Sequence, residues 1–462
     1  DALLHLGSIK FGEGKFADAE PLFRQLVAAY PNHTKALNHL VNALLYLDKI
    51  DEAEALSKKA YGLEPGDFET ILTYGLVLQE RGKSSEAEAL FRQAVALNPN
   101  SAEAWNNVGM SLQFQGRAED AITCYEKANV LKPAFAGAYT NKAQSLMALG
   151  RLSEGWDIYR HRFENKTNGA NRRGYLLPLW SGKAADGLKL LVWTDQGLGD
   201  ELLYASMLPD LQKRGIDVVL ECSERLVPLF KRSFPGLPVV PRRTPPDAAI
   251  QSFKPNTHIS LAELGALFRP RMSSFPPRRG YLRPDPDRTA AIRSRYRAVA
   301  GSKPLIGVSW KSENPKTGKF KSVAADQWRE LLAGTDAYFV SLQYGDDAAD
   351  LAVISDGGRV QVFKDPDIDP VADVDHFAAQ VAALDFVITV SNTTAHVAGG
   401  LNVPVWLLAP QGQGMLWYWF FDGAYSPWYA SMRIFRQARP GVWSHALEEI
   451  AANLKSLNVA AS

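Results

Sequence analysis

Cysteine is almost absent from this 462-residue chain, which contains only Cys124 and Cys222. Two cysteines far apart in the sequence exclude a disulfide scaffold and a cysteine-rich zinc site, and they favour a reducing, cytoplasmic setting. Long hydrophobic runs are lacking too, because stretches such as 386–390 and 403–409 are far too short to span a membrane. Neither sign of charge dominates, since 51 basic and 50 acidic residues leave a net charge of +1. This balance argues against a chain-wide electrostatic attraction to nucleic acid or anionic lipid.

The composition that remains is that of a globular protein, with 46% hydrophobic and 22% charged residues. It excludes a disordered or fibrous chain. A length of 462 residues predicts roughly two to four domains.

The first third of the chain repeats every 34 residues. Four kinds of position share this period: a proline, a small residue, a large residue and a turn formed by glycine or aspartate before a basic residue. The prolines are Pro31, Pro65, Pro99 and Pro133; the small residues are Ala19, Ala53, Ala87, Ala121 and Gly155; the large residues are Phe23, Phe91, Tyr125 and Tyr159; the turns are Gly14-Lys15, Asp48-Lys49, Gly82-Lys83, Gly116-Arg117 and Gly150-Arg151. In its period and in these positions the region resembles the tetratricopeptide repeat.

Each repeat should be a pair of helices, and proline should end the second helix because it interrupts the hydrogen-bond ladder. Five units would stack into a right-handed α-solenoid with a concave surface. Such arrays usually hold a peptide or a partner protein, and packing against a neighbouring domain is the alternative. Polar side chains on the first helices are candidate groove contacts, although solvated helix faces explain them equally well: Asn38, Asn42, Asn106, Asn107 and Asn141.

The rest of the chain alternates between strand and helix patterns. A strand at 188–193, a glycine-rich turn at 194–200, helical spacing over 201–214 and a strand at 217–221 predict a βαβ unit with a parallel sheet. A second alternation begins at residue 304. The predicted domains are therefore a repeat array over 1–165, one α/β half over 175–285 and another over 286–462, with a linker at 165–174. Ligands of two such halves are expected in the cleft between them.

Two loops of this α/β region carry candidate chemistry. Gly197-Leu-Gly199-Asp200 follows the first strand, but it lacks the third glycine of a dinucleotide site and could be only a tight turn. Ser391-Asn-Thr-Thr394 ends a later strand and opens a helix, where free backbone N–H groups bind phosphate. Simple capping of the helix would explain one such residue, not four in a row. His396 is equally compatible with a ligand contact and with packing.

The α/β region resembles the heptosyltransferases of glycosyltransferase family nine, in particular bacterial proteins that fuse tetratricopeptide repeats to such a domain. The segments that carry the resemblance are 196–200, 306–328 and 390–400, together with 341–343, 404–408 and 426–437. The resemblance implies a GT-B fold with two Rossmann-like halves, an acceptor side followed by a donor side. It implies no essential metal and no cofactor besides the nucleotide-sugar donor.

The resemblance also implies roles for single residues. Asp200 would be the general base that takes the acceptor's proton, with Glu201 and Asp195 as runners-up. Lys321, seven residues before Trp328, would meet the donor phosphates. Alternatives to that lysine are Lys311 and Lys319.

The donor-binding set predicted from the matched motifs contains residues of both halves. They are Gly197, Gly199, Trp310, Lys321, Gln343, Ser391, Asn392, Thr393, Thr394 and His396, with Ser426 and Trp428 as further positions. Heptosyltransferases usually have Asp-Thr where this chain has Ser391-Asn392. The neutral loop predicts a more anionic donor, for example a CMP-linked acidic sugar. The aromatic residues at 417–421, 428 and 429 are expected either to pack in a seam or to stack on the ligand.

These observations predict a cytoplasmic, metal-independent, inverting glycosyltransferase whose repeats recruit a protein acceptor. Bacterial flagellin glycosylation is the setting that the resemblance implies. A lipopolysaccharide-type heptosyltransferase and a non-catalytic repeat scaffold are the alternatives. Nucleic acid is not expected as a partner, because the arginine-rich stretch 269–297 does not have the pattern of an interleaved aromatic platform on which bases stack. No His or Cys cluster has the spacing of a metal site.

Overall fold

The computed structural model describes residues 2–164, 173–183, 185–277 and 280–460. The chain divides into two compact units, Asp1–Leu146 and Met147–Ser462. Most of the predicted linker at 165–174 lies outside the described residues. The predicted domain limits stay predictions.

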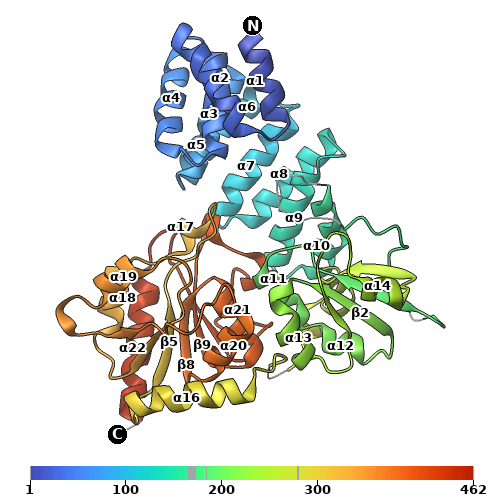
Figure 1. The fold of residues 1–462 in the computed structure, drawn as a ribbon. Coiled ribbons are helices and arrows are strands. Elements are labelled where there is room, and N and C mark those ends of the chain that lie inside the picture. The colour runs from blue at the N-terminus through green and yellow to red at the C-terminus, as the bar shows by residue number, and fades with distance from the viewer. Residues whose placement is uncertain (1, 165–172, 184, 278–279, 461–462) are drawn as a thin grey trace. The chain divides into compact units, whose positions relative to one another are not determined.

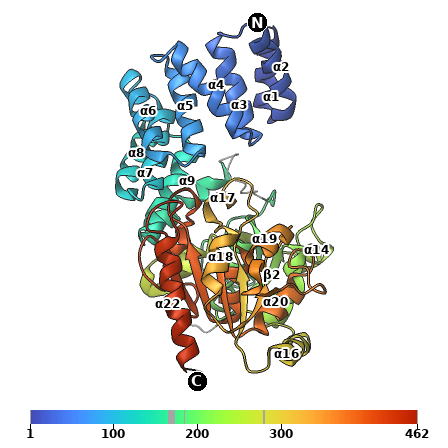
Figure 2. The ribbon, with the colours of Figure 1, turned by 90° about the vertical axis from the view of Figure 1, so that its left-hand side faces the viewer.

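The first unit is a series of helices that pack against their neighbours in chain order (Figure 1 and Figure 2). The series consists of α1 (Ala2–Gly12), α2 (Phe16–Ala29), α3 (Thr34–Tyr46), α4 (Ile50–Leu63), α5 (Phe68–Glu80), α6 (Ser84–Leu97), α7 (Ala102–Phe114), α8 (Ala118–Leu131) and α9 (Ala136–Ala148). The turn positions all have a positive φ, between 57° at Asp48 and 79° at Gly150. Glycine takes this conformation without strain, and aspartate is one of the few other residues that tolerate it.

A glycine on the first helix makes room for an aromatic ring on the second helix of the same repeat. A Cβ added to Gly75 would stand 2.5 Å from the ring of Phe91, and one on Gly109 would stand 2.6 Å from Tyr125. In the second repeat both positions change together, since Val41 and Ser57 replace the glycine and the ring and both are buried. In this repeat the larger residue on the first helix therefore compensates for the smaller residue on the second.

The second unit contains two parallel sheets, which confirms the predicted fold class of a helical repeat region followed by two α/β halves of GT-B type. The first sheet has the order β3-β2-β1-β4 and the second the order β10-β9-β8-β5-β6-β7. The strands of the first are β1 (Lys189–Trp193), β2 (Asp217–Cys222), β3 (Val239–Pro241) and β4 (Thr257–Ser260). Those of the second are β5 (Leu305–Ser309), β6 (Tyr338–Ser341), β7 (Val362–Phe363), β8 (Phe386–Val390), β9 (Val405–Ala409) and β10 (Met432–Arg436).

Helices precede, connect and follow these strands. In and before the first half they are α10 (Leu152–Tyr159), α11 (Leu198–Ala205), α12 (Leu208–Gln212), α13 (Val227–Ser233), α14 (Ala248–Phe253) and α15 (Leu264–Phe268). In the second half they are α16 (Pro286–Ala300), α17 (Gly318–Lys321), α18 (Ala325–Leu332), α19 (Ala348–Ile354), α20 (Val374–Ala382), α21 (Thr393–Leu401) and α22 (Ser444–Ala460). Short 3-10 helices include η1 (Arg160–Phe163), η2 (Glu224–Leu226) and η6 (Trp417–Trp419).

The helical spacing over 201–214 corresponds to two helices rather than one, α11 and α12. Pro209 explains the break, because a proline ring clashes with the carbonyl group four residues earlier. That residue is Ala205, where α11 ends. The shorter α11 starts earlier than expected, so that Asp200 belongs to its first turn.

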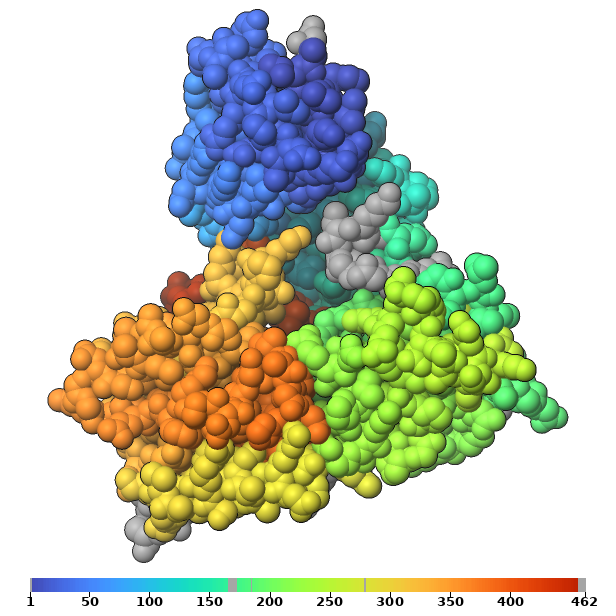
Figure 3. Space-filling model, in the orientation of Figure 1, coloured from blue at the N-terminus to red at the C-terminus, as the bar shows by residue number. Residues whose placement is uncertain are grey.

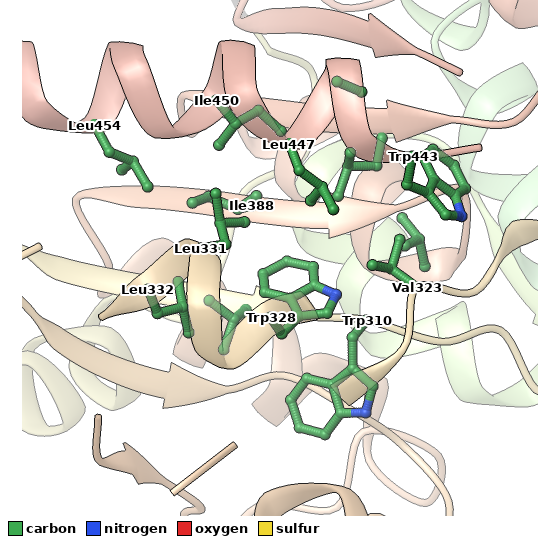
Figure 4. Close-up of a cluster of buried hydrophobic side chains, with 14 of the residues drawn as sticks. Trp310, Val323, Trp328, Leu331, Leu332, Ile388, Trp443, Leu447, Ile450 and Leu454 are labelled. Atoms are coloured by element: carbon green, nitrogen blue, oxygen red, sulfur yellow. The ribbon is translucent and has the colours of Figure 1, made fainter. Parts of the chain in front are cut away.

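The core of the second half lies between its sheet and the helices α18 and α22. Leu447, Ile450 and Leu454 of α22 point toward Trp328 and Leu331 of α18 and toward the strands (Figure 4). The two halves adjoin in Figure 3, where the green surface of the first meets the orange surface of the second. Contacts of α11 with α21 and of α13 with α20 join them.

Candidate active site

Asp200 lies in the first turn of α11, the helix that follows β1 after a short loop. Its carboxylate accepts a hydrogen bond from the backbone N–H of Gly197. Burial raises the pKa of Asp200 to about 6, although the positive charge of Lys321 acts in the opposite direction. A carboxyl group with this pKa can accept a proton near neutral pH.

Lys321 comes from the second half, at the end of α17, and only 6% of it is exposed. Burial lowers the pKa of its ammonium group to about 8, and the negative charge of Asp200 opposes that shift. No hydrogen bond or ion pair to this ammonium group is present among the described residues. Lys311 differs, because it is paired with Asp350 at 3.1 Å and with Glu313 at 3.4 Å. Lys319 is exposed.

The two carboxylates that rival Asp200 are occupied by partners. Asp195 forms a buried ion pair with Arg162 at 3.0 Å and accepts a hydrogen bond from Ser260 at 2.5 Å. Glu201 accepts from the backbone N–H of Ser223 at 2.8 Å and lies 3.4 Å from Arg242. Burial raises the pKa of Glu201 to about 7, but its carboxylate is turned toward these partners. Asp200 alone of the three faces the second half.

The loop after β8 begins with Ser391 and Asn392, whose side chains form hydrogen bonds within the second half. Ser391 accepts a hydrogen bond from the indole N–H of Trp419 at 2.8 Å. Asn392 caps α21 by accepting from the N–H of Thr394 at 3.1 Å, and it donates to the hydroxyl of Ser309 at 2.8 Å. A direct contact of either residue with a donor stays a prediction.

The first turn of α21 offers further polar groups. Thr393 is half-buried, whereas Thr394 is fully buried. The Oγ1 atom of Thr394 has no hydrogen-bond partner within the described part of the chain. An unpaired buried hydroxyl group beside a helix start is the kind of group that a bound phosphate would satisfy.

His396 is buried between the halves. Its Nδ1 lies 2.8 Å from the hydroxyl of Tyr429, its Nε2 lies 3.4 Å from the hydroxyl of Tyr418, and its ring stacks on Trp419. Burial lowers the pKa of His396 to about 3, so the ring is neutral at physiological pH. Its role in donor binding stays a prediction.

Trp310 and Gln343 lie behind the loops rather than on their open side. Trp310 belongs to the core of the second half and donates its indole N–H to Asp350 at 2.9 Å. Gln343 is fully buried, and its Oε1 accepts from the backbone N–H groups of Trp310 and Lys311 at 3.1 and 3.0 Å. These bonds hold the start of the loop that leads to Lys321. A direct contact of either side chain with the donor stays a prediction.

Sequence reasoning missed Tyr418 as an individual site residue, because it treated residues 417–421 as one aromatic group. The structure separates its members: the ring of Trp419 stacks on His396, whereas the hydroxyl of Tyr418 lies 3.4 Å from Nε2 of His396. Ser426 accepts from the N–H of Trp428 at 3.2 Å and so shapes its own turn. Nothing in the sequence pattern distinguished Tyr418 from its aromatic neighbours.

The asparagines on the first helices of the repeats fall into two groups. Asn38 and Asn106 are buried, and each forms a hydrogen bond with the next repeat. Asn38 donates to the hydroxyl of Thr70 at 2.9 Å, and Asn106 accepts from the side chain of Asn141 at 3.1 Å. Asn42 and Asn107 are half-buried. The first group therefore joins neighbouring repeats, and the second leaves polar atoms available on the surface of the array.

No group of three or more His, Cys, Asp or Glu side chains within the described part of the chain could hold a metal ion. No helix among the described residues is both long and apolar enough to cross a membrane.

Family models of the tetratricopeptide repeat match residues 10–56, 44–108 and 102–135. Protein FlbA of Caulobacter vibrioides (strain ATCC 19089 / CIP 103742 / CB 15) is 32% identical over 321 residues, or 66% of this chain and 52% of FlbA. The chain thus spans about half the length of this curated relative.

Two solved structures are similar to this chain over 36% of its length. TTC0263, a thermophilic TPR protein in Thermus thermophilus, is 21% identical, with a TM-score of 0.33 over 36% of this chain and 91% of that one. MamA 41-end from Desulfovibrio magneticus RS-1 is 17% identical, with a TM-score of 0.31 over 36% and 96% of the two chains. The family models show tetratricopeptide repeats in the N-terminal part of the chain, and two α/β halves follow these repeats.

Proposed function

We propose that this chain is an inverting glycosyltransferase that moves a sugar from a nucleotide-sugar donor to a hydroxyl group of a protein. The observation that supports this most is the electrostatic influence of Asp200 and Lys321 on each other. A carboxylate from one α/β half and an ammonium group from the other act on each other's pKa, and each belongs to the helix that follows a parallel strand, β1 or β5. Ligands of open α/β sheets bind at such edges.

Asp200 would remove the proton of the acceptor hydroxyl as its oxygen attacks the anomeric carbon. The pKa of about 6 keeps this carboxylate mostly ionised at pH 7 and still basic enough to take the proton. A single direct attack of this kind inverts the configuration of the sugar. No second free carboxylate is needed, which agrees with the pairing of Asp195 and Glu201 elsewhere.

Lys321 would stabilise the leaving nucleotide. Its ammonium group is buried and unpaired among the described residues, so an anion placed there would gain an interaction at low dielectric. The start of α21 with the free hydroxyl of Thr394 would add hydrogen bonds to the same phosphate groups. The neutral pair Ser391-Asn392 leaves this side without a carboxylate, which favours an acidic sugar on a CMP donor.

The repeats would recruit the protein acceptor. Tetratricopeptide arrays present an extended concave face that suits a polypeptide, and the half-buried Asn42 and Asn107 offer polar contacts on it. A flagellin is the acceptor that the family resemblance implies.

A thermal-shift panel tests the donor half of this proposal. CMP, UDP, GDP and ADP are added singly at millimolar concentration to the full chain. At 100 times its Kd, a ligand stabilises the folded state by about 2.7 kcal/mol, which raises the melting temperature by a few degrees. We expect CMP to give the largest rise. No rise with any of the four nucleotides would contradict the transferase proposal and favour a non-catalytic scaffold.

A further inference from the structure

Helix α10 continues the repeat pattern, but it belongs to the second compact unit. Tyr159 stands at the large position of the fifth repeat, and the unit that contains it begins at Met147. Trp156 anchors the helix on the first α/β half, because its indole N–H donates to the carbonyl oxygen of Arg269 at 3.0 Å. The ring of Trp156 also lies directly against Gly265 of α15. The last helix of the repeat pattern is therefore part of the fold that carries the proposed base.

The hydroxyl group of Tyr159 has an unusual partner for its position in the repeat. The first and third repeats have phenylalanine there, without a hydroxyl group. In the fourth repeat the hydroxyl of Tyr125 donates to Gln113 of the same repeat at 2.8 Å. Tyr159, which is only 4% exposed, instead accepts a hydrogen bond from the side-chain amide of Gln196 at 3.1 Å. Gln196 lies outside the repeats, in the loop between β1 and α11.

A second side chain from the same segment holds the residue before Gln196. Arg162 of η1 donates through Nε to Oδ2 of Asp195 at 3.0 Å and through Nη2 to the hydroxyl of Ser260 at 3.0 Å. Ser260 donates in turn to the other carboxylate oxygen of Asp195 at 2.5 Å. All three of these side chains are buried. Two consecutive residues of the loop are thus held by α10 and η1.

The proposed base follows this loop at once. Gly197 is the N-cap of α11, and Asp200 lies in the first turn of that helix. A Cβ added to Gly197 would stand 3.6 Å from Oδ2 of Asp200. Residues 195–197 belong to no helix or strand, so their side-chain bonds decide where α11 begins. A displacement of about 1 Å at a catalytic group can lower a rate about 100-fold.

We propose that Tyr159 is a positioning residue, which acts through Gln196 to hold the loop before Asp200 in place. Arg162 supports the same loop, but its buried ion pair also stabilises the fold, so Tyr159 is the residue that can be tested by itself. The inference rests on the proposed function of Asp200. It gives a residue of the repeat pattern a role in the transfer step, in addition to the recruitment of the acceptor by the array.

Hydrogen exchange tests the proposal without any substrate. Amide exchange of the full chain is measured by mass spectrometry for the wild type, Tyr159→Phe and Tyr125→Phe. Loss of the hydrogen bond to Gln196 should make the amides of residues 195–200 exchange about 3- to 10-fold faster in Tyr159→Phe. Tyr125→Phe is the matched control, because it removes a buried, hydrogen-bonded hydroxyl at the same repeat position and leaves the loop unchanged.

Two results of this measurement would overturn the proposal. One is equal exchange of residues 195–200 in all three proteins, and the other is an equal increase across the whole second unit, which a purely structural role would cause. Gln196→Met removes the same hydrogen bond from the other side. It should accelerate exchange over the same residues even if Tyr159→Phe does not fold.

A double-mutant cycle then measures the effect on transfer, with a CMP-linked acidic sugar as donor and a flagellin as acceptor. Tyr159→Phe and Gln196→Met should each lower kcat about 10-fold and leave the KM for the donor unchanged, since neither variant alters the second half. The double variant should be no slower than the slower single variant, because both remove one interaction. Losses that multiply would show that the two residues act independently, and they would contradict the proposal.

The base variant separates a failure of this inference from a failure of the proposed function. If Asp200→Ala keeps full transfer activity, the base assignment is wrong, and the positioning of a base by Tyr159 falls with it. If Asp200→Ala is inactive while Tyr159→Phe keeps the wild-type kcat despite faster exchange, the role of Tyr159 alone is refuted. An inactive Asp200→Ala with faster exchange and a lowered kcat in Tyr159→Phe is the result that we expect.

Discussion

Gly199 lies directly against His396, across the boundary between the two α/β halves. A Cβ added to Gly199 would stand 2.9 Å from Cδ2 and 3.3 Å from Nε2 of the imidazole. The ring has no room to retreat, because it stacks on Trp419 and bonds to Tyr429. The glycine before the proposed base is thus required by the close approach of the second half.

The variant Gly199→Ala should therefore push α11 away from α21. We expect a loss of about 1–3 kcal/mol in the free energy of unfolding from the overpacking, and a strong loss of transfer activity because Asp200 is the next residue. Gly334→Ala is the control, since its nearest neighbouring atom would be 4.0 Å away. Denaturant unfolding measures both variants, and equal stabilities would show that the close contact does not exist in solution.

The pH dependence of transfer should be bell-shaped. Asp200 must be ionised to accept a proton, so activity falls as pH drops through about 6. Lys321 must be protonated to stabilise the leaving nucleotide, so activity also falls as pH rises through about 8. Initial rates at subsaturating substrate measure both limbs. A flat profile between pH 5 and pH 7 would show that a different group is the base.

Replacing Lys321 by methionine should weaken nucleotide binding. The loss of a charge-assisted bond to phosphate, about 1.5–3 kcal/mol, corresponds to roughly 10- to 100-fold in Kd. Titration of the nucleotide that gives the largest thermal shift measures the change. Lys319→Met is the matched control, because that lysine is exposed and two residues away. Equal effects of the two substitutions would indicate a general charge effect instead of a site at Lys321.

Arg162→Ala should destabilise the second unit severely. The side chains of Arg162 and Asp195 are both only 2% exposed, and removing one partner of a buried ion pair costs about 3–5 kcal/mol. Arg160→Ala should change the free energy of unfolding by less than about 1 kcal/mol, because the Arg160 side chain is 54% exposed and lies 3.5 Å from Glu263. The melting temperatures of the two variants provide the comparison. Similar values would mean that Asp195 finds another partner.

Removing the repeats should abolish transfer to the protein acceptor without affecting nucleotide binding, provided that the cut spares α10. Trp156 of α10 packs against Gly265 and Tyr204, and Arg162 follows directly after this helix. A chain of residues 147–462 should therefore show the same nucleotide-induced thermal shift as the full chain. A chain that begins at residue 166 should unfold at a lower temperature. Full transfer to the protein acceptor by residues 147–462 would contradict recruitment by the repeats.

The sequence by itself determined the architecture of this protein, because its signals are local and periodic. The 34-residue spacing of proline, glycine and aromatic residues predicts the helix pairs, and strand, glycine turn and helix in succession predict parallel sheets. It also pointed to Asp200 and Lys321 through their places in matched motifs. The apolar spacing over 201–214 predicted one helix, whereas Pro209 divides this stretch between α11 and α12.

The tertiary structure alone decided which of these groups are available for chemistry. Asp195 and Glu201 are as acidic as Asp200 in the sequence, but Arg162 and Arg242 reach them from distant segments. Tyr418 looks like its aromatic neighbours in the sequence, and only folding brings its hydroxyl to 3.4 Å from Nε2 of His396. Ionisation depends on burial and on charges brought close by folding, and no local pattern in the chain encodes either.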